Sequence, residues 1–212
     1  MEILTLYRHP LSGHSHRVEL FLSLLGLPFR MVDVSFAARE HKAPEFIAKN
    51  LFGQLPVLEH GALVIPDSMA ILVYLAKTYD TTGLWLPEEP ALAAQVQRWF
   101  SVAAGQLVEG PARARAAAVF GRDVDTTANR ELARHLFATL DAHLVAAGRP
   151  FFVGERATVA DLALYTYVGH APEGGVSLAP FPALRGFVGA VEALPGFVPM
   201  QATDTAAGRA AE

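Results

Sequence analysis

Segments with the pattern of β-strands occur only in the first third of this chain, and this asymmetry limits the folds it can adopt. Short apolar runs at residues 2–7, 29–34 and 57–65 have the length and composition of buried strands. Beyond residue 90 the sequence is rich in alanine and leucine, and its apolar residues recur with helical spacing. The pattern predicts an α/β domain followed by an all-α domain. We expect the α/β domain at 1–80, a linker at 81–90, the helical domain at 91–202 and a flexible tail at 203–212.

The order of elements within the first domain restricts its sheet. A helical repeat of apolar residues separates the first two strands, so these strands should be parallel and joined by a right-handed crossover. A short helix over 44–50, a hairpin turning at His60-Gly61 and a helix capped by Asp67 or Ser68 follow. The expected order is βαβαββα, around a small mixed sheet.

The second domain should consist of helices alone. We expect one helix from residue 91 to about 120, interrupted near Pro111, because proline cannot donate the helical hydrogen bond. A second helix spans 127–147, and another begins at Thr158. Thr158 and Asp161 have the spacing of a capping box, which indicates a folding element rather than a reacting group.

Composition excludes several classes of function. The chain of 212 residues is 52% hydrophobic and 18% charged, with a net charge of −4, which gives no electrostatic reason to expect nucleic acid or a membrane surface as a partner. It has no cysteine, which excludes disulfides, thiolate metal sites and a cysteine nucleophile. We see no signal-peptide pattern and no apolar run long enough to span a bilayer. We therefore expect a cytoplasmic protein without a metal cofactor.

A proline interrupts the third predicted strand, in Gly53-Gln54-Leu55-Pro56-Val57. Proline removes a donor from the sheet, so it marks a strand entry, an edge or a cis bond. A cis bond before Pro56 would turn the backbone N–H and C=O of Leu55 outward. These groups could then pair with an extended peptide ligand, as an added strand does.

Taken together, the element order and these motifs resemble the cytosolic glutathione transferases, whose first half is a thioredoxin-like domain. The resemblance covers essentially the whole chain. The segments that carry it are Leu24-Leu25-Gly26-Leu27-Pro28-Phe29, Gln54-Leu55-Pro56-Val57, Asp67-Ser68 with the helix to Leu75, and Thr158-Val159-Ala160-Asp161-Leu162. It implies glutathione as co-substrate and a homodimer, to which Glu59, Met69 and Arg98 are possible contributors.

The resemblance also implies where glutathione binds. Leu55 should pair through its backbone with the cysteinyl residue, with Pro56 in cis and Gln54 beside it. Asp67 and Ser68 should hold the γ-glutamyl end, where a helix N-terminus favours a carboxylate. Both residues also suit plain helix capping, and one residue can do both.

His41 and Lys42 precede the second helix, where related enzymes hold the glycyl carboxylate of glutathione. The competing interpretation is that they are ordinary solvated charges of a loop. The sequence does not choose between these two roles.

The activating residue should lie near the start of the first long helix. The thiolate of glutathione is the nucleophile, so a hydroxyl or another donor is needed to stabilise it. Ser12 fits the pattern of bacterial, serine-type (theta-like) members, whereas Tyr7, His14 and Ser15 remain rivals. Arg17 lies one turn further along, either as a cation beside the pocket or on a solvated helix face.

The electrophile pocket should lie between the loop after the first strand and the first long helix of the second domain. We expect Leu11, His14, Gln106 and Arg113 to line it. We also considered Trp99, Phe100, Glu109 and Phe120, and expect Trp99 and Phe120 to belong to the core. Arg113 and Arg115 would suit an acidic substrate or an exposed helix face equally well.

The function that the resemblance implies is a glutathione S-transferase, activating the thiol for attack on a small hydrophobic electrophile in detoxification. A glutathione-dependent isomerase or dehalogenase is the alternative. Its isomerase relatives carry a Ser-Ser-Cys run where this chain has Ser12-Gly13-His14. A non-catalytic binding or regulatory protein of the same fold is the third possibility.

Overall fold

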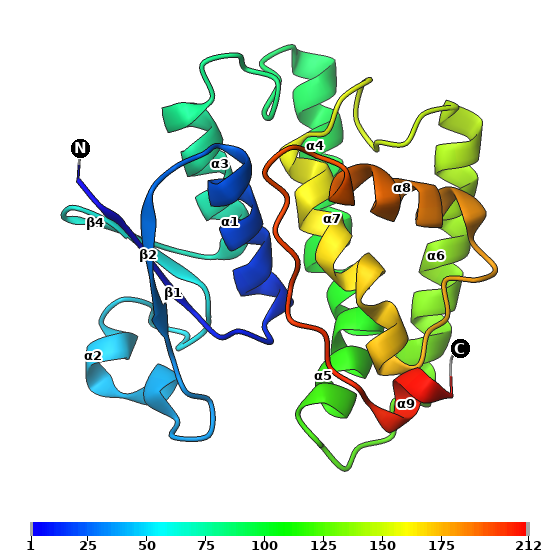
Figure 1. The fold of residues 1–212 in the computed structure, drawn as a ribbon, viewed down its shortest axis with the longest axis horizontal. Helices are drawn as coiled ribbons and strands as arrows, with labels where there is room; N and C mark the ends of the chain where they lie inside the picture. The colour runs from blue at the N-terminus through cyan, green and yellow to red at the C-terminus, as the bar shows by residue number, and fades with distance from the viewer. Residues whose placement is uncertain (1, 211–212) are drawn as a thin grey trace.

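The computed structural model describes residues 2–210, which form two lobes (Figure 1). The first lobe contains β1 (Leu4–Arg8), α1 (Gly13–Leu24), β2 (Phe29–Asp33), α2 (Pro44–Ile47), β3 (Val57–His60), β4 (Leu63–Pro66) and α3 (Ser68–Tyr79). The predicted order βαβαββα is confirmed. Helix α1 begins at Gly13, before the first residue of its apolar repeat. It begins there because the side chain of Ser12 caps the helix.

The sheet has the strand order β2-β1-β3-β4. β1 and β2 pair in parallel, with Leu4 opposite Phe29, whereas β3 is antiparallel to both β1 and β4. The parallel pair confirms the expected crossover. Because side chains alternate across a strand, Leu6 packs in the main core with α1 and α3, whereas Tyr7 packs on the opposite face beside α2.

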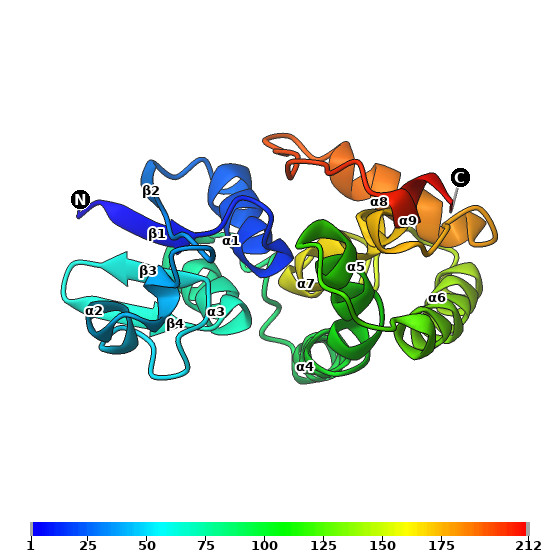
Figure 2. The ribbon, with the colours of Figure 1, turned by 90° about the horizontal axis from the view of Figure 1, so that it is seen from below.

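The second lobe is helical, as expected. It contains α4 (Pro90–Ala104), α5 (Arg113–Val119), α6 (Thr127–Ala147), α7 (Val159–Gly169), α8 (Pro182–Glu192) and the short α9 (Ala206–Arg209). Figure 2 shows α1 and α7 meeting where the two lobes join. None of the helices within residues 2–210 combines the length and the apolar character that crossing a membrane requires.

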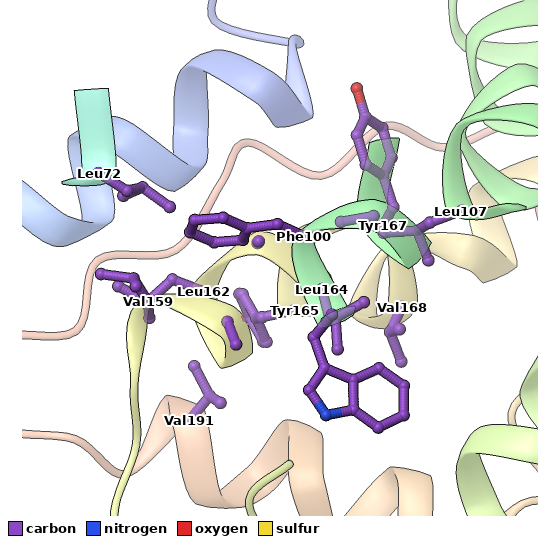
Figure 3. Close-up of a cluster of buried hydrophobic side chains, with 14 of the residues drawn as sticks. Leu72, Phe100, Leu107, Val159, Leu162, Leu164, Tyr165, Tyr167, Val168 and Val191 are labelled. Atoms are coloured by element: carbon purple, nitrogen blue, oxygen red, sulfur yellow. The ribbon is translucent and has the colours of Figure 1, made fainter. Parts of the chain in front are cut away.

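Helix α7 is the centre of the helical lobe, and its residues from Val159 to Val168 are all buried. Figure 3 shows its side chains among Phe100 of α4, Leu72 of α3 and Val191 of α8. The predicted capping box is present at its start, where Asp161 accepts hydrogen bonds from the Thr158 N–H (2.7 Å) and hydroxyl (2.9 Å). The same carboxylate accepts from the N–H of Phe152 (2.8 Å), so it also fixes the preceding loop.

The expected helix from 91 to about 120 is divided in two. α4 ends at Ala104, the backbone of Gly105 leaves the helical region, and a wider π-helical turn (Val108–Ala112) leads into α5. Pro111 lies inside this turn. Because proline has no N–H to donate, a local widening of the helix there is a physical consequence of the sequence.

The C-terminal strap, residues 195–205, returns along α1 toward the other end of the molecule (Figure 1). Ser23 Oγ of α1 donates to the carbonyl of Gly196 (2.7 Å). Within the expected flexible tail, Thr205 is buried and donates to the carbonyl of Glu173 (2.6 Å), and α9 follows it. Residues 211–212 of that expected tail lie outside the described residues.

Candidate active site

A large cleft of about 1520 Å³ lies where the two lobes meet. The α/β lobe contributes the loop after β1, residues 36–42, residues 47–56 and the start of α3. The helical lobe contributes the π-helical turn, α5, the loop that follows it and Tyr167 of α7. The motifs identified in the sequence therefore converge on one cleft, although they lie far apart along the chain.

Ser12 lines this cleft at the N-terminus of α1. Its side-chain oxygen accepts a hydrogen bond from the N–H of Ser15 (3.3 Å). Since the oxygen acts there as an acceptor, the hydroxyl proton remains free for donation to a group in the cleft. The helix dipole favours negative charge at the same place.

Two of the rivals do not line the cleft. The Tyr7 hydroxyl donates to Glu59 Oε2 (2.9 Å) on the α2 side of the sheet, because Tyr7 points to the opposite face from Leu6. Ser15 is 1% exposed, and its oxygen accepts from the N–H of His9 (3.3 Å). The geometry therefore favours Ser12 over Tyr7 and Ser15 as the hydroxyl that reaches the cleft.

His14 does line the cleft, one residue beyond Gly13. Its ring lies edge-on to the ring of Tyr167, with 5.1 Å between centroids. Removal from water, together with the nearby Arg17 cation, lowers the pKa of His14 to about 3. A neutral imidazole can exchange hydrogen bonds with a ligand but offers no positive charge to a thiolate.

In the wall formed by Gln54, Leu55 and Pro56, the carbonyl of Gln54 accepts from Asn50 Nδ2 (2.8 Å), whereas the backbone of Leu55 is unpaired within the described part of the chain. The Leu55–Pro56 peptide bond is cis, and β3 begins only at Val57. The Leu55 side chain is buried beside Val57. Within residues 2–210, no hydrogen bond uses the N–H or C=O of Leu55, so both groups are available to an extended ligand.

Asp67 and Ser68 line the cleft at the start of α3. Asp67 Oδ1 caps the helix by accepting from the N–H groups of Met69 (2.9 Å) and Ala70 (3.0 Å). Asp67 has a φ of 76°, a backbone conformation that is uncommon for residues other than glycine. One carboxylate oxygen of this exposed residue therefore remains for a cation in the cleft.

Arg17 contacts Ser68 and is 0% exposed, so of its two expected places the solvated helix face is excluded. Its guanidinium donates to Ser68 Oγ (3.1 Å) and to the carbonyl of Ala163 on α7 (2.8 Å). Burial lowers the pKa of Arg17, which the neighbouring Tyr167 and Asp67 partly offset. The buried positive charge of Arg17 therefore lies next to the N-terminus of α3, a position that favours a bound anion.

His41 and Lys42 lie at another part of the cleft, near Gly53. Lys42 Nζ donates to the carbonyl of Phe52 (2.9 Å), and the ring of His41 lies edge-on to Phe36 (4.9 Å). Burial, followed by the charge of Lys42, lowers the pKa of His41. Gly53 has a φ of 56°, and a Cβ there would lie 2.5 Å from the carbonyl oxygen of His41. Glycine thus permits the close approach of these two loops.

The lining that the helical lobe contributes to the cleft mixes apolar and charged side chains. Its apolar members include Val108, Ala112, Ala116 and Phe120, to which the α/β lobe adds Leu11 and Phe36, and its charged members include Arg115, Arg122 and Asp125. Arg113 lines the cleft too, but its guanidinium pairs with Glu109 (2.8 Å), one helical turn before it. Gln106 is not among the lining residues, because α4 ends before it and the turn leaves its side chain exposed.

Several cleft residues were not identified from the sequence. Phe36 belongs to a polar loop, and its ring stacks on His9 (4.3 Å) and meets Phe120 edge-on (5.7 Å). Phe120, expected in the core, lines the cleft, whereas Trp99 is buried as expected. Within residues 2–210, no cluster of acidic and histidine side chains has the makeup of a metal site.

Comparison with known proteins agrees with this architecture. Residues 2–77 match the family model described as glutathione S-transferase, N-terminal domain, and residues 117–198 match the model described as glutathione S-transferase, C-terminal domain. Maleylacetoacetate isomerase of Rhizobium meliloti (strain 1021) is 34% identical over 186 residues, covering 84% of this chain and 86% of that protein.

Two further proteins share this similarity along most of their length. Glutathione S-transferase 1 of Dianthus caryophyllus is 30% identical over 190 residues, covering 85% of this chain and 83% of that protein. The crystal structure of a glutathione S-transferase from Pseudomonas fluorescens Pf-5 superposes with a TM-score of 0.85 at 30% identity, covering 93% of this chain and 98% of that one. The chain belongs to the cytosolic glutathione S-transferase superfamily.

Proposed function

We propose that this protein is a glutathione S-transferase that uses Ser12 to activate the thiol of glutathione for attack on a small hydrophobic electrophile. The observation that carries the proposal is the position of Ser12, at a helix N-terminus in the same cleft as the unpaired Leu55 backbone and Asp67-Ser68. Family membership supports the transferase activity and glutathione as its co-substrate.

The glutathione peptide would bind along the wall of the α/β lobe. Its cysteinyl backbone pairs with the N–H and C=O of Leu55, which places the sulfur near Ser12. The γ-glutamyl carboxylate lies at the start of α3, and the ammonium reaches the free oxygen of Asp67. Lys42 and His41 face the glycyl carboxylate, and Gln54 contacts the peptide between these two ends.

Activation requires a lower thiol pKa. A free thiol has a pKa of about 8.5, and lowering it by about two units takes roughly 2.7 kcal/mol of selective stabilisation of the thiolate. A hydrogen bond from Ser12 to the sulfur, with the helix dipole behind it, supplies stabilisation of that order. The lowered pKa of His14 makes this imidazole a weaker source of positive charge than Ser12 is of a hydrogen bond.

The apolar part of the cleft lining suits the hydrophobic group of a small electrophile. Phe36 and Phe120 offer aromatic surface, and Ala112 and Ala116 are small side chains beside the cleft. Arg113 is already paired with Glu109, which weakens the case for a strongly acidic substrate.

Glutathione-dependent isomerisation is a second candidate, favoured by the similarity to the maleylacetoacetate isomerase relative. The same bound thiolate would add to the substrate and leave again after bond rotation, so the cleft serves either reaction. A thiol-activation experiment therefore tests what both candidates share, and a comparison of electrophiles with isomerisable substrates separates them.

The test is replacement of Ser12 by alanine. We expect Ser12→Ala to bind glutathione within about threefold of the wild-type affinity, because the peptide contacts are retained. The pKa of the bound thiol should rise by about two units, with roughly 25-fold less thiolate and a correspondingly lower kcat/KM at pH 7. Calorimetric titration measures the affinity, and thiolate absorbance against pH measures the pKa.

Tyr7→Phe is the matched control, since it also removes one hydroxyl from the first lobe but outside the cleft. It should leave the thiol pKa unchanged. An unchanged thiol pKa in Ser12→Ala would contradict the assignment of Ser12, and a shift in Tyr7→Phe instead would transfer the role to that hydroxyl.

We also propose that the protein is a cytoplasmic homodimer. A shallower groove lies between α3 and α4, lined by Met69, Ala70, Val73, Gln97, Phe100, Ser101 and Ala104. Its small and apolar residues suit contact with a second copy of the chain. Of the contributors expected from the sequence, Met69 lines this groove, whereas Glu59 is engaged by Tyr7 and Lys49.

A further inference from the structure

Two side chains of the helical lobe contact the residues on either side of Ser12. Arg115 of α5 donates from Nη1 to the carbonyl oxygen of Leu11, at 2.8 Å. The ring of Tyr167 on α7 packs edge-on against the ring of His14, with 5.1 Å between centroids. The turn that carries Ser12 is thus fixed immediately before and shortly after it, by residues more than a hundred positions away in the sequence.

The turn has little room to move between these two contacts. A Cβ at Gly13 would lie 2.7 Å from the ring of Tyr167, so the aromatic ring fills the space against the turn. Tyr167 is itself 7% exposed and belongs to the buried helix α7. Displacing the turn would therefore require displacing a core side chain, which close packing opposes.

Arg115 is held as firmly as the turn. Its side chain is 2% exposed, and Nε lies 2.8 Å from Glu173 Oε2. Glu173 also contacts His170 through Oε1 (2.6 Å), and its carbonyl accepts from the Thr205 hydroxyl (2.6 Å). The carboxylate of Glu173 compensates the buried charge of Arg115, and within residues 2–210 Nη2 has no hydrogen-bond partner. This arrangement fixes the Nη1 atom that reaches Leu11.

We propose that Arg115 and Tyr167 are positioning residues that aim the Ser12 hydroxyl at the thiol of bound glutathione. The helical lobe then takes part in activating the thiol, in addition to holding the electrophile. The inference rests on the proposed role of Ser12. By this inference α5 and α7 do more than line the cleft, because they also orient Ser12.

A double-mutant cycle on the full chain tests this inference. Tyr167→Phe removes one oxygen and keeps the ring, and Arg115→Lys keeps a cation for Glu173, so folding should survive. Each change alone should raise the pKa of the bound thiol by about one unit, which is roughly threefold less thiolate at pH 7 if the wild-type value lies about two units below that of a free thiol. Each should leave glutathione affinity within about threefold of wild type. In a Ser12→Ala background neither change should shift the thiol pKa further.

The outcomes separate this inference from the proposed function. If Ser12→Ala leaves the pKa of the bound thiol unchanged, Ser12 does not activate the thiol. The inference about Arg115 and Tyr167 then fails as well. If Ser12→Ala raises the thiol pKa, and Tyr167→Phe or Arg115→Lys raises it further in the Ser12→Ala background, the inference is overturned. The proposed role of Ser12 then still holds. Arg134→Met, which removes an exposed cation from α6, is the matched control and should leave the thiol pKa at its wild-type value.

Discussion

At the scale of single residues, Asp67 caps α3 and is proposed to bind the ammonium of glutathione, two roles that the sequence could not separate. One carboxylate oxygen caps α3 by accepting two backbone N–H groups, and the left-handed φ of 76° turns the chain so that the residue lies at the cleft. The two roles use different properties of the side chain. Capping needs an oxygen acceptor, whereas binding of an ammonium group needs negative charge.

Asp67→Asn should therefore weaken glutathione binding without destabilising the fold. Asparagine keeps the acceptor oxygen and tolerates a positive φ, but it loses the charge. We expect about tenfold weaker glutathione affinity by calorimetric titration, consistent with the loss of about 1.4 kcal/mol from one charge-assisted contact. The melting temperature should change by no more than about 2 °C.

Asp67→Ala provides the comparison, because it removes the cap together with the charge. It should lose glutathione affinity to a similar degree and also lose about 1 kcal/mol of unfolding free energy. Wild-type affinity in Asp67→Asn would show that capping is the only role of this residue.

At the scale of elements, α1 joins the two lobes through side chains that are buried on nearly every side. His16 is 2% exposed, and its Nε2 lies 2.9 Å from the carbonyl of Val198 in the C-terminal strap. Its Nδ1 lies 3.1 Å from Thr166 Oγ1 of α7. A neutral imidazole that donates from Nε2 and accepts at Nδ1 satisfies both neighbours.

The burial of His16 should make the fold sensitive to acid. Removal from water is the main cause that lowers its pKa from 6.5 to about 4. Between these pH values the unfolded chain binds a proton that the folded chain does not, so stability is full above pH 6.5 and falls as the pH drops toward 4. Chemical denaturation across this range should show a loss of about 3 kcal/mol from this residue.

His16→Gln should flatten that pH dependence, since glutamine keeps a donor and an acceptor but does not titrate. The exposed residue His135 on α6 offers the control, and His135→Gln should retain the wild-type slope. Equal slopes in His16→Gln and wild type would assign the acid sensitivity to another group, of which His14 is the first to examine.

At the scale of the whole molecule, the groove between α3 and α4 should carry the dimer. Val73→Glu places a charge in that groove and should convert the protein to a monomer, because an unpaired charge is costly at a buried interface. Sedimentation velocity measures the change. Val145→Glu alters an apolar residue that is 65% exposed on α6 and should leave the dimer intact. A wild-type protein that sediments as a monomer would contradict the proposed assembly.

The fold, and the residues by which the α/β lobe lines the cleft, could be predicted because their signals are local. Strand alternation, the proline after Leu55 and the cap at Asp67 depend on neighbouring residues only. The environment of Arg17 depends on where α3 and α7 pack, so its burial could not be read from helical periodicity. Gln106 was misplaced for a similar reason, since the helix before it ends at Ala104.

The buried guanidinium of Arg17 has a consequence for how such a protein can be recombined. It joins an oxygen of Ser68 in one lobe to the backbone carbonyl of Ala163 in the other. The second partner is main chain, so a chimaera carrying a foreign helical half would not need alanine at this position. It would need the corresponding helix in the same axial register, since a shift of one residue would rotate the carbonyl away and leave a cation buried without its acceptor. Helix register, more than side-chain identity, therefore determines which halves of related chains can be exchanged.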